Sequence, residues 1–157
     1  MLNKIKWLLL GFIAISIITV TYIVSVVRYA ETERTALNDY AESLLALLEV
    51  ESVQSIHRFN GQESYIVANV EHVDGQKLYF FVRDGSIQYY FIASELIHAD
   101  DANMIAKNLI QNGEIINTQL GILDETPIFE IQIRYEELVH YIIINAQTRE
   151  VVMNFYI

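Results

Sequence analysis

The most pronounced hydrophobic pattern in the chain is an uncharged run near its start, at residues 7–27. Its 21 residues are about as many as a helix needs to cross a ~30 Å hydrocarbon core. Lys4 and Lys6 precede the run, which favours a cytoplasmic N-terminus, and the single Arg28 that follows it weakens this preference without reversing it. We therefore expect a cytoplasmic segment at 1–6, a transmembrane helix at 7–28 and an extracytoplasmic remainder. The alternative, a cleaved signal peptide, would have a shorter apolar core of roughly 7–15 residues.

Helical spacing of apolar residues continues beyond this run. Between Gly11 and Gly61 there is neither glycine nor proline, and the spacing predicts a helix from about 30 to 50. Its apolar positions are Leu37, Tyr40, Ala41, Leu44, Leu45 and Leu48. Two arrangements remain open: one continuous helix with the membrane segment, or a break near Glu31–Glu33.

Strand-like runs and turn signals fill the rest of the chain. The first group of runs covers 52–59, 64–72, 76–83 and 86–92, with Asp74-Gly75 and Asp84-Gly85 as hairpin turns. A second helix follows, with Asp100 as its N-cap and Gly113 as its C-cap glycine. The second group of strand runs covers 114–122, 127–135, 138–145 and 150–156.

The two groups match at an offset of 64 residues, which indicates a duplication. Tyr65-Ile66-Val67 overlays Phe129-Glu130-Ile131, and 83–92 overlays 147–156. The predicted fold class is α+β: an N-terminal transmembrane helix followed by two tandem units of a helix plus an antiparallel sheet. We place the first unit at 29–93 and the second at 94–157.

Aromatic residues concentrate on two successive predicted strands. Alternation places Phe80, Tyr89 and Phe91 inward, and it places three others on the opposite face. These three, the candidate partner-binding residues, are Tyr79, Phe81 and Tyr90. If this face is exposed it forms a patch typical of protein contacts, and otherwise the second unit covers it. The final run, VVMNFYI, would accept a partner strand if it lies at a sheet edge.

Charge and composition exclude several classes of function. The chain has a formal net charge of −10, and residues 29–157 hold 7 bases against 20 acids, a net of −13. Such a domain does not attract nucleic acid or other anionic polymers. The absence of cysteine excludes disulfides and cysteine-ligated metal sites.

Residues that could carry chemistry are present but not in a catalytic arrangement. The four histidines, none in a metal-like pair, are His57, His72, His98 and His140. The acid pairs at 100–101, 124–125 and 136–137 fall in predicted turns or at a helix start, and no serine stands in a nucleophile motif. We therefore expect a protein that is not an enzyme, with no catalytic, cofactor-binding or metal-binding residues.

The layout resembles the YpmB, or TseB-like, cell wall elongation regulators of Gram-positive bacteria. The segments that carry the resemblance are 61–87 and 121–152. The second is similar to a PepSY ending, whose last hairpin closes with an Asp-x-x-x-Gly turn, although here Asn145 replaces the aspartate and Arg149 the glycine. The resemblance implies two cystatin-like or PepSY-like units and a role beside a class B penicillin-binding protein, with no cofactor.

Three functions are compatible with these features. The first is a non-catalytic, membrane-anchored regulator of peptidoglycan elongation that binds a penicillin-binding protein. The second is an inhibitor of an extracytoplasmic peptidase, and the third is a sensor of a wall fragment or an ion.

Overall fold

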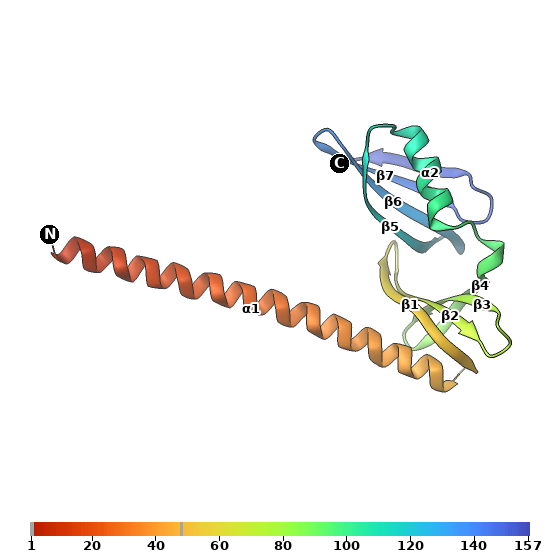
Figure 1. The fold of residues 1–157 in the computed structure, drawn as a ribbon, viewed down its shortest axis with the longest axis horizontal. Coiled ribbons are helices and arrows are strands. Elements are labelled where there is room, and N and C mark those ends of the chain that lie inside the picture. The colour runs from red at the N-terminus through yellow and green to blue at the C-terminus, as the bar shows by residue number, and fades with distance from the viewer. Residues whose placement is uncertain (1, 48) are drawn as a thin grey trace. The chain divides into compact units, whose positions relative to one another are not determined.

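The N-terminal part of the chain is a single long helix. The computed structural model describes residues 2–47 and 49–157, with side chains described for 15–46 and 49–157. Helix α1 runs without interruption from Leu2 to Leu47 (Figure 1). The continuous alternative is therefore confirmed, and there is no break near Glu31–Glu33. The helix ends before residue 50, where strand β1 begins.

This helix has the properties that a bilayer requires. Over residues 15–30 its apolar side chains are exposed, and the helix is long and apolar enough to cross a membrane. The hydroxyls of Thr19, Thr21 and Ser25 each donate to the backbone carbonyl four residues earlier, at 2.8–2.9 Å. These bonds matter because a hydroxyl in hydrocarbon finds no water to bind. The expected apolar N-terminal helix is thus confirmed.

The first sheet is a four-stranded antiparallel meander in the order β1-β2-β3-β4. Its strands are Val50–Asn60, Ser64–His72, Lys77–Arg83 and Ser86–Ile92. Both predicted Asp-Gly hairpins form. Gly75 and Gly85 have φ values of 83° and 73°, which residues other than glycine adopt only at an energetic cost.

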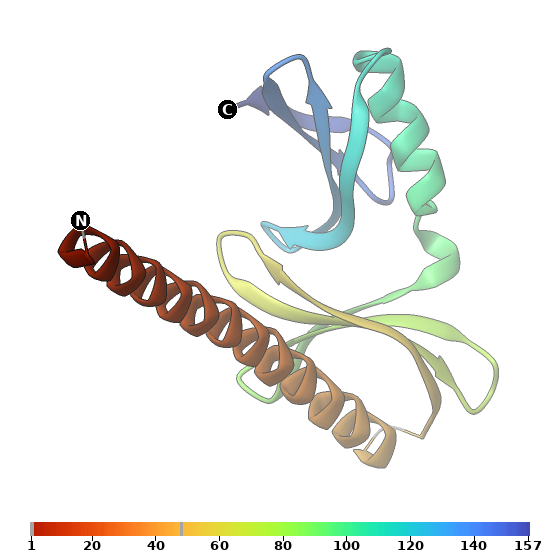
Figure 2. The same ribbon diagram turned by 60° about the vertical axis from the view of Figure 1, so that its left-hand side comes forward.

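The second half repeats this order. A short 3-10 helix, η1 (Ala93–Glu95), leads to helix α2 (Ala99–Leu109) and to a second antiparallel sheet, β5-β6-β7-β8. Its strands are Glu114–Leu123, Thr126–Tyr135, Leu138–Asn145 and Val151–Tyr156. Helix α2 lies along one face of this sheet (Figure 2). The predicted fold class, an apolar helix followed by two tandem helix-and-sheet units, is confirmed.

Both predicted caps of α2 are wrong. The N-cap is His98, and Asp100 lies in the first turn, where its charge still favours the helix dipole. The C-cap is Ile110, three residues before Gly113. Gly113 is needed for a different reason: a methyl group there would overlap the side chain of Ile133.

Residues 41–157 form one compact unit and residues 1–40 another. In the larger unit a single hydrophobic core takes side chains from both sheets, among them Phe59 and Phe81 from the first and Ile131 from the second. At the junction, a ring nitrogen of His57 lies 2.9 Å from the Leu120 carbonyl oxygen. The Phe59 ring lies against Gly121, where any side chain would overlap it. The boundary placed at 93–94 falls within η1 and stays a prediction.

Candidate interaction surface

The strand register corrects the predicted grouping of the aromatic residues. Phe81 stands opposite Tyr89, and Phe80 stands opposite Tyr90. Because directly opposed residues of an antiparallel pair share a face, Phe81 and Tyr90 lie on opposite faces. The prediction that Tyr79, Phe81 and Tyr90 form one exposed patch is therefore wrong.

Of these three residues, Phe81 belongs to the core and Tyr79 packs against it. Phe81 is 0% exposed, and its ring makes edge-to-face contacts with Tyr65 (6.4 Å between centroids) and Phe91 (5.7 Å). Tyr79 is half-buried against the same core, and burial raises the pKa of its phenol. Residues of the second sheet complete this core, so the alternative in which the second unit covers the aromatic face is the one observed. Phe81 is consequently not available to a partner.

Tyr90 has a different environment. It lies on the edge strand β4 and is 66% exposed. Of the three predicted contact residues, it alone has an exposed ring. It stays a candidate for partner binding.

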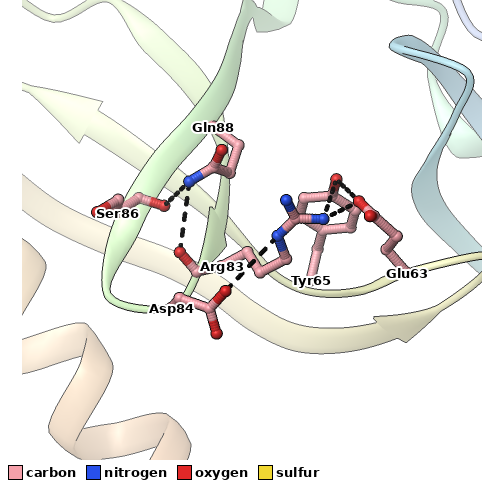
Figure 3. Close-up of polar contacts among 6 residues, drawn as sticks. All are labelled: Glu63, Tyr65, Arg83, Asp84, Ser86 and Gln88. Carbon is pink, nitrogen blue, oxygen red and sulfur yellow. Dashed lines mark hydrogen bonds and ion pairs between the residues drawn. The ribbon is translucent and has the colours of Figure 1, made fainter.

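A cluster of polar side chains borders the aromatic core (Figure 3). Arg83 forms an ion pair with Glu63, and the Tyr65 hydroxyl donates to Glu63 at 2.7 Å. The Arg83 guanidinium also lies over the Tyr65 ring, 5.5 Å from its centroid. Burial, followed by the nearby Tyr89, raises the pKa of Tyr65. The cluster therefore fixes the Tyr65 ring between the core and the solvent.

Beside this cluster lies a shallow hollow of about 160 Å³ between the two sheets. Its lining residues are Gln62, Glu63, Tyr65, Tyr89, Ile122, Asp124 and Glu125. Three of these are acids, so the hollow repels anions. Asp124 and Glu125 form the β5–β6 turn with φ values of 46° and 65°. In the described part of the chain, no group of three or more acids or histidines is placed to hold a metal ion, and these three acids are no exception.

The histidines have separate structural settings. His57 contacts a carbonyl at the junction of the sheets, and His98 is the N-cap residue of α2 but makes no side-chain hydrogen bond to the helix. The Nδ1 atom of His72 lies 3.0 Å from Asp74 in a hairpin turn. His140 lies between the rings of Tyr135 and Tyr156. The structure does not bring any two of them together among its described contacts.

The last strand, β8, forms a surface whose exposure could not be predicted from the sequence. β8 is an edge strand of the second sheet, and every residue in it is exposed. Phe155 stacks on Tyr141 of β7 with ring centroids 5.2 Å apart. The uncharged run VVMNFYI was the available signal, but the sequence left open whether the strand is central or at an edge. Here it forms an apolar margin of the sheet.

The turn before β8 contains the two departures from the PepSY pattern. The Asn145 side-chain oxygen accepts the backbone N–H groups of Gln147 and Thr148, at 2.8 and 2.9 Å. Arg149 adopts φ 69°, a value that glycine adopts without strain. Asn145 thus accepts the hydrogen bonds that an aspartate at this position would accept. Arg149 adopts a backbone conformation that suits glycine.

Comparison with known proteins bears on the fold alone. No family model matches the chain, and no curated protein matches it. Among solved structures, the YpmB protein from Bacillus subtilis is similar, with a TM-score of 0.63 at 19% identity. The match covers 75% of this chain and 94% of that one. The chain therefore has a YpmB-like fold.

Proposed function

We propose that this chain is a non-catalytic, membrane-anchored regulator of peptidoglycan elongation. Its folded unit acts outside the cell membrane and binds a class B penicillin-binding protein. The observation that carries the proposal is a YpmB-like fold in a chain that begins with a helix apolar enough to cross a membrane.

Physical considerations support binding to another membrane protein. A domain anchored to the bilayer meets other anchored proteins at a high effective concentration, so a moderate affinity suffices. With a net charge of −13 over residues 29–157, the domain is steered toward basic protein surfaces and away from anionic wall polymers.

The proposed orientation places the N-terminus in the cytoplasm, because Lys4 and Lys6 precede the apolar run. Since the chain lacks cysteine, a single introduced cysteine is the one site that a maleimide can label, and its labelling shows on which side of the membrane it lies. We expect a membrane-impermeant maleimide to label Gln147→Cys in intact cells and to label Asn3→Cys only after lysis. Labelling of Asn3→Cys in intact cells would contradict the orientation.

The partner can be tested in cells with the full chain. A tagged chain is crosslinked with formaldehyde in its native membrane, purified, and probed with a fluorescent penicillin that labels penicillin-binding proteins. We expect one labelled class B protein to co-purify. One control carries the same helix on an unrelated domain, and another carries residues 29–157 on an unrelated membrane helix. The proposal would be contradicted if the first control captured the protein, or if neither the full chain nor the second control did. Capture of a peptidase instead would support the alternative function, inhibition of an extracytoplasmic peptidase.

A further inference from the structure

Strand β8 leaves one row of its backbone hydrogen-bonding groups unpaired. Ile157 and Val139 exchange both of their backbone bonds, at 3.1 and 3.0 Å. Bonded and non-bonded pairs alternate in an antiparallel ladder, so Phe155 and Met153 also bond to β7. Asn154 and Tyr156, which lie between them, therefore direct their N–H and C=O groups away from the sheet.

This edge lacks the features that normally block strand addition. Natural edge strands are protected by charged side chains, proline or a covering segment. Residues 151–157 contain neither a charged side chain nor a proline, and all of them are exposed. The other edge strands are less open: β1 carries Glu51 and Arg58, and β5 contacts β1. Strand β4 also has no charged residue or proline, but four of its seven residues are half-buried, whereas all of β8 is exposed.

Acidic residues lie beyond both ends of β8. Glu150 directly precedes the strand and is exposed. Because Ile157 stands beside Val139, the exposed Glu136-Glu137 turn lies just beyond the other end. Arg149 lies 3.9 Å from Asp101, so Glu150, Asp101 and Arg149 together leave a net negative charge at this end. The edge thus combines an uncharged apolar centre with negative ends.

We propose that β8 binds an extended segment of another protein as a fifth strand of the second sheet. That segment is apolar at alternate positions in its centre and carries lysine or arginine at both ends. The inference rests on the proposed function in that the segment belongs to the membrane partner. A second copy of this chain fits poorly, because antiparallel β8 strands would bring Glu150 of one copy toward the Glu136-Glu137 turn of the other.

The proposal can be tested with synthetic peptides and the full chain in detergent micelles. One peptide has seven alternating valines and threonines between pairs of lysines, and its matched control has glutamates in place of the lysines. We expect the lysine peptide to bind at least about tenfold more tightly by fluorescence anisotropy, with an affinity that falls as salt rises. Equal affinities, or no binding of the lysine peptide, would overturn the proposal.

Variants locate the binding edge. Asn154→Pro removes an outward N–H, which an edge strand tolerates, and should weaken lysine-peptide binding at least about tenfold with an unchanged melting temperature. Tyr156→Ser should also weaken binding, whereas Met104→Ser on helix α2 should not, although Met104 and Tyr156 are similarly exposed at 60% and 64%. Equal losses from the two serine variants, or dimerisation of the chain that Asn154→Pro abolishes in sedimentation, would refute this assignment.

The same variants separate this inference from the proposed function. If the wild-type chain and Asn154→Pro capture a penicillin-binding protein equally well in cells, the function stands and the β8 site fails. If the wild-type chain captures none while the lysine peptide binds β8, the site stands and the proposed partner fails.

Discussion

At the scale of single residues, the turn between β7 and β8 keeps a geometry while its residue types differ. The Asn145 oxygen accepts two backbone N–H groups, as an aspartate would. Arg149 occupies a left-handed conformation that costs an L-residue about 1–2 kcal/mol. The resemblance to a PepSY ending identified both positions as departures, and of the two only Arg149 has a positive φ and so a conformational cost.

Arg149→Gly should therefore stabilise the protein by about 0.5–1 kcal/mol, because relief of the strained φ exceeds the added flexibility of the unfolded chain. The lost contact with Asp101 is exposed and contributes little. Thermal and denaturant unfolding of the full chain in micelles would measure the change. Arg149→Ala, which keeps the Cβ atom, is the matched control, and an equal gain from it would contradict the explanation.

Asp74 should make stability depend on acid pH. The backbone N–H of Gln76, followed by the His72 side chain, holds the pKa of Asp74 below its ordinary value. A carboxylate with a lowered folded pKa contributes stability above its unfolded pKa near 4, and this stability is lost as pH falls through the folded pKa. The stability difference between wild type and Asp74→Ala should be present at pH 5 and shrink below about pH 4.

Denaturant titrations at each pH would measure that difference. The same titrations in a His72→Gln background separate the two causes. A pH dependence that disappears entirely with His72 would show that the Gln76 bond is not the main one.

At the scale of elements, turn chemistry and strand patterns were readable from the sequence, whereas the ends of α2 were not. Both Asp-Gly hairpins form because glycine supplies the positive φ that each turn requires. The N-cap prediction failed because the helix begins earlier than expected. The last extended residue before it is His98, so both adjacent acids, Asp100 and Asp101, lie inside the first turn. Gly113 and Gly121 serve close packing, which depends on distant residues and leaves no local pattern.

Gly121→Ala should destabilise the junction of the sheets by about 1–3 kcal/mol, since its methyl group would overlap the Phe59 ring. Denaturant unfolding would measure the loss. A second variant that combines Gly121→Ala with Phe59→Leu should recover part of the stability relative to the sum of the two single changes. Strict additivity would indicate that Phe59 is not the residue displaced.

At the scale of the whole molecule, the sequence predicted two repeated units but not which faces meet. The first sheet has buried residues on both faces, for example Val67 and Phe81 on one and Ala68 and Phe80 on the other. Alternation between inward and outward positions therefore carries no information there. This is why Phe81 was predicted at an exposed surface although it lies at the centre of the shared core.

Phe81→Ala should lower the unfolding free energy by about 3–5 kcal/mol, because a fully buried ring is lost from a core shared by both sheets. Tyr90→Ala, on the other face, should change it by no more than about 0.5 kcal/mol. Hydrogen exchange should show that Phe81→Ala weakens protection in strands of both sheets. Loss of protection confined to the first sheet would contradict a single shared core.

The open edge of β8 also bears on how the protein behaves in concentrated solution. An apolar strand with free backbone groups nucleates aggregates when copies approach closely, and here the net charge of −10 opposes that approach. At physiological ionic strength this repulsion reaches only about 8 Å, and at 1 M salt about 3 Å. Solubility should therefore decline as salt is added or as the pH approaches the isoelectric point near 4.7, so low-salt, mildly alkaline buffers suit its purification.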